Sequence, residues 1–174
     1  LPMHQPEVNA EGEPLPVKFE EITFGPVHQV RKEFSVKKPV THARLYMTAH
    51  GVYLPLLDGE RIGQYELTPG HTMYRNQLFY QIYDITGSLT PGSHTIGAYI
   101  ADGWYRGRMG FDGSNCQQGN ELALLLQLEL EYEDGSSDKV CSDDSFQVTE
   151  GAYIYAGMMT GEKYDARLEK KDFF

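Results

Sequence analysis

Residues 101–115, ADGWYRGRMGFDGSN, gather side chains that could recognise a small molecule. They include the only tryptophan of the chain, and the candidate ligand-binding residues are Trp104, Tyr105, Arg106, Arg108, Asp112 and Asn115. An aromatic ring can bind the C–H face of a sugar, and planar polar groups can bind pairs of hydroxyls. Glycines let the backbone turn sharply around such groups. The pattern indicates a recognition loop, although Trp104 could equally close the end of a hydrophobic core.

Size and charge restrict the class of protein. The 174 residues suffice for one domain, which would bury about two thirds of the surface that its unfolded chain exposes. The net charge is −10, from 25 acidic residues against 15 Lys and Arg, and it repels phosphate backbones. No apolar run approaches the roughly 20 residues that span a bilayer. We therefore expect neither a nucleic-acid partner nor a membrane, whereas 12 tyrosines suit a neutral ligand.

The segments around the loop alternate in the manner of strands. Ala43, Leu45, Met47 and Ala49 point to one side of their segment, and leucines repeat at every second position over 122–130. Asp58-Gly59 and Asp134-Gly135 favour tight hairpin turns. Residues 78–86 and 93–102 have the pattern of further strands, separated by GSLTPG. About eight short strands with frequent turns predict an all-β fold, an antiparallel β-sandwich.

The ends of the chain have a different composition. Residues 1–16 are rich in Pro, Glu and other polar residues without periodicity, which predicts an N-terminal arm or linker before a sandwich over 17–160. Residues 161–174 become charged and lose alternation, and we expect an exit linker there. Cys116 and Cys141 match no metal-ligand spacing and are expected as free thiols, which fits a reducing, cytoplasmic compartment. No signal sequence is recognisable, but the chain begins at Leu1, so the compartment stays open.

An ordered set of segments resembles the N-terminal sandwich domain of bacterial α-L-rhamnosidases. The segments are ARLYMTAHGVYLPLLDGERIG, LTPGHTMYRNQLFYQIYDIT, GSHTIGAYIADGWYRGRMG, LLLQLELEYEDGSSDKVCSDDSF and GEKYDAR. The resemblance covers about residues 30 to 167, and it is the ordered set that is specific, since YEDGS alone is only a hairpin. It implies a jelly-roll, galactose-binding-like module that precedes a separate catalytic domain on the same chain. The chain would then be a fragment of a glycoside hydrolase without its catalytic region.

The resemblance also implies a cofactor. In some relatives such a sandwich is a calcium-dependent rhamnose-binding module in which loop oxygens hold the ion. Calcium takes six to eight oxygen ligands, so loop Asp and Asn residues are the proper class, and the candidates are Asp58, Asp112 and Asn115. Gly59 puts a second side-chain ligand at the first hairpin in doubt.

Three functions follow from these observations. The loop could dock against the catalytic domain, or it could bind L-rhamnose or a rhamnosylated glycan, since interfaces and sugar sites use the same aromatic and arginine side chains. Catalysis by this chain alone is the least favoured function. A glycosidase needs two carboxyl groups at a fixed separation, whereas Asp beside Gly is explained by turns. We therefore expect no catalytic residue here.

Overall fold

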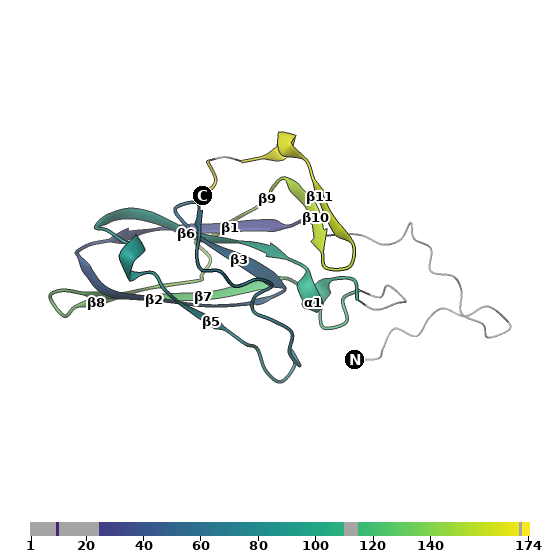
Figure 1. Cartoon of the computed structure of the whole chain (residues 1–174), viewed down its shortest axis with the longest axis horizontal. Coiled ribbons are helices and arrows are strands. Elements are labelled where there is room, and N and C mark those ends of the chain that lie inside the picture. Colours follow the sequence, from purple (N-terminus) through teal and green to yellow (C-terminus); the bar gives the residue numbers. More distant parts are fainter. Residues whose placement is uncertain (1–9, 11–24, 110–114, 171) are drawn as a thin grey trace.

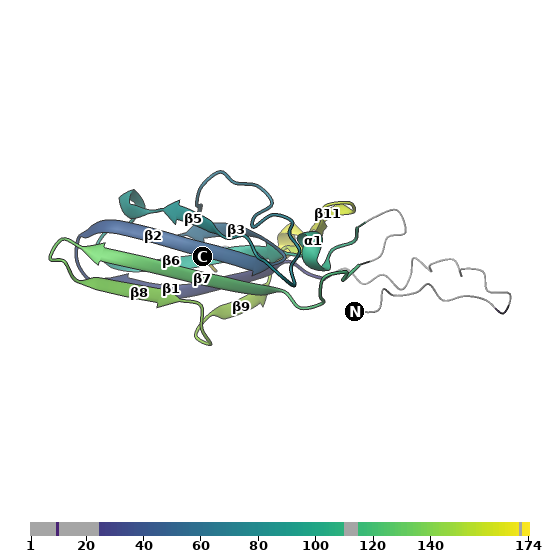
Figure 2. The ribbon, with the colours of Figure 1, turned by 90° about the horizontal axis from the view of Figure 1, so that it is seen from below.

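Two antiparallel sheets pack face to face in the computed structural model of this chain, which describes residues 10, 25–109, 115–170 and 172–174 (Figures 1 and 2). The strands are β1 (His28–Val36), β2 (Val40–His50), β3 (Val52–Leu57), β4 (Glu60–Arg61), β5 (Gln81–Asp84), β6 (Gly92–Ala101), β7 (Ala123–Tyr132), β8 (Ser137–Cys141), β9 (Gln147–Glu150), β10 (Tyr153–Gly157) and β11 (Gly161–Tyr164). The short helices are α1 (Gly103–Arg106) and the 3₁₀ helices η2 (Thr86–Ser88) and η3 (Ala166–Leu168).

The chain crosses repeatedly from one sheet to the other. The five-stranded sheet has the order β4-β3-β6-β1-β9, and the four-stranded sheet has the order β5-β2-β7-β8. Strands β10 and β11 form a separate hairpin over the five-stranded sheet (Figure 1). Neighbours such as β1 and β6, or β2 and β7, are distant in the sequence and pair antiparallel. The prediction of an antiparallel β-sandwich is confirmed.

The core lies between the two sheets and is built from the alternating residues. On β2 the predicted inward set, Ala43, Leu45, Met47 and Ala49, is at most 2% exposed. Leu126, Leu128 and Leu130 of β7 are equally buried and face the core as well. Glu, Leu and Ala are good helix formers, yet here the period of two decides the conformation because a strand with that period buries Leu126, Leu128 and Leu130 on one side.

One polar group ties the two sheets together inside this core. The Tyr53 hydroxyl, from the five-stranded sheet, lies 3.1 Å from the Met47 carbonyl oxygen, 2.7 Å from Gln81 Oε1 and 3.2 Å from the Tyr83 hydroxyl, all in the other sheet. Burial is the main cause that raises the pKa of Tyr53. The buried hydroxyl therefore stays protonated and hydrogen-bonded.

The tight turns lie where they were predicted. Asp58-Gly59 joins β3 to β4 with φ angles of 50° and 82°, and Gly135, with a φ of 79°, lies between β7 and β8. Cys116 and Cys141 are both free thiols. No helix within the described residues is long and apolar enough to cross a membrane.

The segment expected as an exit linker contains ordered elements. Strand β11 and helix η3 both fall within 161–174, and the Phe174 ring lies so close to Gly97 that a β-carbon there would meet it at 2.7 Å. The expected start of the sandwich near Val17 lies outside the described residues. The domain boundaries stay a prediction.

Candidate functional site

Helix α1 places the predicted recognition residues at one end of the sandwich, directly after β6 (Figures 1 and 2). Gly103 begins the helix with a φ of 53°, a left-handed conformation that glycine adopts without strain. A β-carbon at Gly103 would approach the Val52 side chain to 2.4 Å. Glycine is therefore needed here both for the turn and for the close approach of α1 to β3.

Tyr105 is held by an aromatic cluster that the sequence did not reveal. Its ring stacks on His50 with 4.4 Å between centroids and 12° between planes, and it meets Tyr74 edge-on at 5.2 Å. His50 ends β2, so this contact joins the two sheets at their ends. Because Tyr105 packs against both rings, it supports the local structure, and its role as a ligand residue stays a prediction.

Arg106 is engaged in an ion pair. Its Nε donates to Asp102 Oδ1 at 2.7 Å, and both side chains are largely shielded from solvent. The Arg106 carbonyl oxygen accepts from the Cys116 N–H at 2.9 Å, which ties the 115–118 segment to the helix. The Nη2 atom is buried and finds no hydrogen-bond partner. Arg106 therefore stabilises the helix, and its Nη2 atom packs against Gly25.

Trp104 follows the first residue of α1. It is half-buried, and its ring lies 6.0 Å from that of His71 at a tilt of 45°. Arg108 is also half-buried, and Asn115 is exposed. Asp112 lies outside the described residues. Trp104 is thus neither a core plug nor a fully exposed platform, since its ring is supported on one side.

Asp58 follows strand β3, at the end of that strand that is farther from α1. Val52, at the start of β3, contacts α1, and Asp58 follows the last residue of β3, roughly 20 Å away at the usual rise of a strand. Its Oδ1 accepts from the Thr95 N–H at 2.7 Å, and its Oδ2 lies 2.6 Å from His94 Nδ1. The structure therefore does not bring Asp58 together with Asn115.

The Asp58 carboxylate controls the ionisation of His94. Burial favours the neutral imidazole, but the hydrogen bonds to Asp58 and to the Thr90 carbonyl oxygen, with the charge of Asp58, outweigh it and raise the pKa of His94. Asp58 therefore acts in the turn itself. The described residues contain no group of three or more His, Cys, Asp or Glu side chains placed to hold a metal ion. Calcium binding by Asp58, Asp112 and Asn115 stays a prediction.

Two histidines and one turn tyrosine contact the predicted site residues of α1, and the sequence did not reveal them. His50, His71 and Tyr74 were assigned no role in the site, because nothing local distinguishes them from surface or core residues. The usable signals were the interruption of the strand by Gly51 directly after His50 and the turn sequence LTPGHTMY. Their meeting with α1 depends on strand pairings far apart in the chain.

Family similarity covers most of the chain. Residues 38–174 match the α-L-rhamnosidase N-terminal domain. The chain belongs to this family. An α-L-rhamnosidase of Streptomyces avermitilis is 45% identical over 143 residues, which make up 82% of this chain and 14% of that enzyme. One from Formosa agariphila is 36% identical over 141 residues, 80% of this chain and 15% of that enzyme.

Solved structures of rhamnosidases share the fold of this N-terminal domain. The Streptomyces avermitilis α-L-rhamnosidase complexed with L-rhamnose superposes with a TM-score of 0.82 at 43% identity, covering 85% of this chain and 14% of that chain. The native enzyme from Aspergillus terreus gives 0.83 at 34% identity, covering 91% and 20%. The rhamnosidase N-terminal domain described here spans only 14–16% of the length of its curated relatives.

Proposed function

We propose that this chain is a non-catalytic accessory domain of an α-L-rhamnosidase that docks against the remaining domains of the enzyme. Family membership and the small fraction of each relative that the chain spans support a role within a longer enzyme. The observation that carries docking is an exposed apolar surface beside β5. Interfaces within one chain combine such apolar groups with a polar rim.

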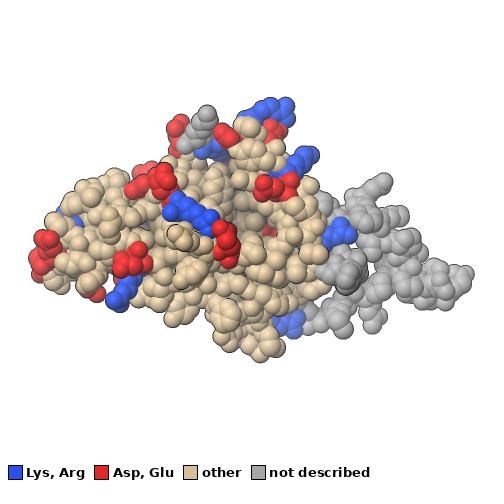
Figure 3. Space-filling model, in the orientation of Figure 1, with Lys and Arg blue, Asp and Glu red and all other residues tan. Residues whose placement is uncertain are grey.

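This surface, called here the 65–82 surface, is formed by six large side chains from one segment. They are Tyr65, Leu67, Met73, Phe79, Tyr80 and Ile82, and all are about half exposed or more. Figure 3 shows a broad area with few charged residues in the lower centre of the view, where β5 and the preceding segment lie. Several large apolar side chains exposed in one segment of a soluble domain are typical of an interaction site. A partner domain on the same chain meets this requirement without a separate binding event.

The charges of the described residues favour a non-catalytic role. Glycoside hydrolysis uses an enclosed pair of carboxyl groups, one of them protonated because its pKa is raised. No Asp or Glu in the described part of the chain is fully buried. The carboxyl pKa values that are shifted are lowered, as at Asp84, Asp138 and Asp165, where side-chain hydrogen bonds from Thr86, Lys37 and Arg167 favour the carboxylate.

Docking is tested in the full-length enzyme that contains this domain. Tyr80→Asp places a charge in the 65–82 surface, and Val148→Asp places the same charge on a similarly exposed residue of β9, in the other sheet. Tyr80→Asp should increase amide hydrogen exchange across the 65–82 surface and lower the unfolding temperature of the catalytic region, whereas Val148→Asp should change neither. Equal behaviour of the two variants would contradict docking through this surface.

Rhamnose binding at α1 is the second candidate, and Trp104 is the observation that favours it. The indole is half-buried and lies near His71, and an indole ring is of the kind that stacks on the C–H face of a sugar. The Streptomyces avermitilis enzyme, 43% identical in this region, was crystallised with L-rhamnose. Few atoms of a monosaccharide would be buried, so we expect a dissociation constant of roughly 10 µM to 10 mM.

Calorimetric titration of L-rhamnose into the folded chain, with and without calcium, tests this candidate. Trp104→Ala should abolish the binding heat while leaving the circular dichroism spectrum and the unfolding temperature nearly unchanged. Tyr80→Ala removes an exposed aromatic ring away from α1 and serves as the matched control. Absence of any heat at high millimolar rhamnose with calcium present would contradict rhamnose binding at α1.

A further inference from the structure

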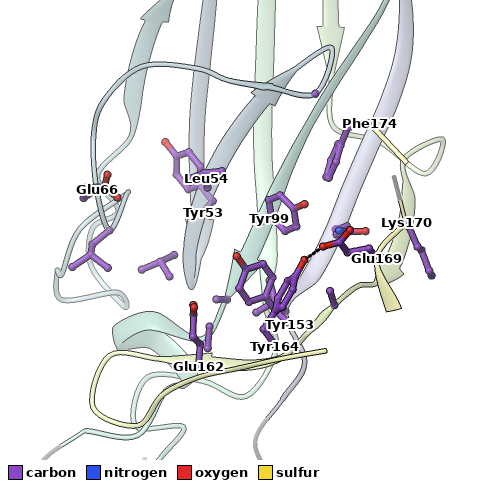
Figure 4. Close-up of a pocket in the computed structure, with 18 of the residues that line it drawn as sticks. Tyr53, Leu54, Glu66, Tyr99, Tyr153, Glu162, Tyr164, Glu169, Lys170 and Phe174 are labelled. Atoms are coloured by element: carbon purple, nitrogen blue, oxygen red, sulfur yellow. Dashed lines mark hydrogen bonds between the residues drawn. The ribbon is translucent and has the colours of Figure 1, made fainter. Parts of the chain in front are cut away.

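A cavity lies on the outer face of the five-stranded sheet; its lining reaches Val52 and Ala101 beside α1 but does not include Gly103–Arg106. Its volume is about 650 Å³, and the β10–β11 hairpin covers one side of it (Figure 4). The floor is formed by Leu54, Tyr99 and Gln29, which the strand registers place side by side across β3, β6 and β1. Cavities of roughly 300–1,000 Å³ typically hold small molecules.

The walls of this cavity, called here the hairpin cavity, are aromatic. Tyr99 contacts Tyr153 and Phe174 at centroid distances of 6.1 and 5.2 Å, and Tyr153 contacts Tyr164 at 4.8 Å. Tyr65 lines the cavity from the segment after β4 and is largely exposed. These rings come from four separate parts of the chain, since Tyr153 and Tyr164 share the β10–β11 hairpin. They line one cavity and supply apolar faces of the kind that sugar rings stack on.

The covering hairpin is fastened to the domain. The Val27 N–H donates to the Tyr153 carbonyl oxygen at 3.2 Å, and the Asp165 N–H donates to the Ala152 carbonyl oxygen at 2.8 Å. The Tyr164 hydroxyl donates to the Glu169 carboxylate (Figure 4), and this hydrogen bond raises the pKa of Tyr164 to about 12. The cavity is therefore formed before any ligand binds, which lowers the entropy lost on binding.

A polar group in the floor lacks a partner. Gln29 is only 5% exposed, and its Oε1 accepts no hydrogen bond. A buried acceptor without a donor is unfavourable, and a hydroxyl relieves it because a hydroxyl both donates and accepts. The last torsion of a Gln side chain has a broad minimum, so a small rotation of the carboxamide turns Oε1 toward a ligand in the cavity.

The charges at the rim select among ligands. Glu66, Glu162 and Glu169 line the cavity together with one lysine, Lys170. Glu66 also pairs with Arg61 at 2.8 Å. The excess of carboxylates disfavours anions, whereas carboxylate oxygens accept hydrogen bonds from sugar hydroxyls. Aromatic faces, an unpaired amide and acceptors at the rim together fit a neutral, polyhydroxylated ring.

We propose that the hairpin cavity is a binding site for a neutral sugar, distinct from the α1 site and independent of whether α1 binds rhamnose. The ligand stacks against the tyrosines, donates one hydroxyl to Gln29 Oε1 and directs the others to the carboxylates at the rim.

Amide-resolved NMR titration of the folded chain tests the proposal. The probes are L-rhamnose, D-galactose and D-glucose, with D-glucuronic acid as the anionic counterpart of glucose. At least one neutral sugar should give saturable shifts at the amides of Tyr99 and Tyr153, with a dissociation constant of roughly 0.1–10 mM. Glucuronic acid should bind more weakly than glucose. Shifts confined to Trp104 and Tyr105 would overturn the cavity site while supporting the α1 site.

Gln29→Leu separates a binding role from a structural one. Leucine keeps a similar volume and removes the unpaired amide, so the unfolding temperature should stay equal or rise while sugar affinity falls about tenfold. Tyr164→Ala should also weaken binding, and Tyr80→Ala, which removes a comparably exposed ring outside the cavity, should not. Unchanged affinity in both Gln29→Leu and Tyr164→Ala would overturn the proposal. So would loss of the sugar-induced shifts in the full-length enzyme, because another part of that chain would then fill the cavity.

Discussion

Leu126→Ala gives the most direct measurement of how the sandwich is held together. Leu126 lies on β7 with none of its surface exposed, in register with Met47 of β2. The substitution removes about three carbons' worth of buried surface, worth roughly 2.4 kcal/mol at about 0.8 kcal/mol per methylene. The residual cavity adds to this loss, so the free energy of unfolding should fall by about 3 kcal/mol, within a range of about 2–5 kcal/mol.

The neighbouring leucine supplies the control. Leu125 is the next residue of the same strand, but it is 64% exposed because successive side chains point to opposite faces. Leu125→Ala should change the free energy of unfolding by no more than about 0.5 kcal/mol. Urea unfolding measures both changes, and in a thermal scan Leu126→Ala should unfold roughly 6–12 °C earlier than the wild type. A loss below about 1 kcal/mol for Leu126→Ala, or equal losses for the two variants, would refute the register and the inward face.

Three further outcomes are expected. The raised pKa of His94 stabilises the folded state below about pH 6.5, and this gain disappears as pH rises through the folded-state pKa. Asp58→Asn should therefore lower the free energy of unfolding, measured with urea, more at about pH 5.5 than at about pH 8.5. The isolated chain should not hydrolyse an aryl rhamnoside above buffer; turnover that Asp112→Asn removes would contradict this. If Asp112 and Asn115 hold calcium, rhamnose binding should fall with chelator and return with calcium but not magnesium; calorimetry with each ion decides it.

Much of the sandwich was accessible from the sequence because its signals are local. The inward residues of β2 and the leucines of β7 repeat at every second position, and that period follows from strand geometry alone. The turns at Asp58-Gly59 and Asp134-Gly135 depend on the residues that occupy them.

The sites were less accessible because they are assembled from distant segments. Tyr105 was predicted as a ligand residue, yet it stacks on His50. The strand pairings within each of the two sheets bring these two residues together. Asp58 was predicted as a metal ligand, but its carboxylate is engaged with Thr95 and His94 in the adjacent strand. Likewise no local sequence pattern predicts the contact between Tyr99 and Tyr153, because it requires the β10–β11 hairpin to fold back over β6. Such contacts depend on the register between strands that are distant in the sequence, and this register cannot be predicted from the hydrophobic period of a single strand.

The buried hydroxyl of Tyr53 has a mechanical consequence. Apolar packing has no preferred direction, so two packed apolar sheet faces resist separation far better than they resist sliding past each other. The hydrogen bonds from the Tyr53 hydroxyl to Met47 and Gln81 fix one position of the first sheet to one position of the second, and they therefore oppose sliding of the sheets. Helix α1 follows a strand of one sheet, whereas His50 ends a strand of the other. The hydrogen bonds of Tyr53 therefore help to keep the two sheets aligned, and we expect Tyr53→Phe to loosen the stacking of Tyr105 on His50 without removing any residue from the end of the sandwich.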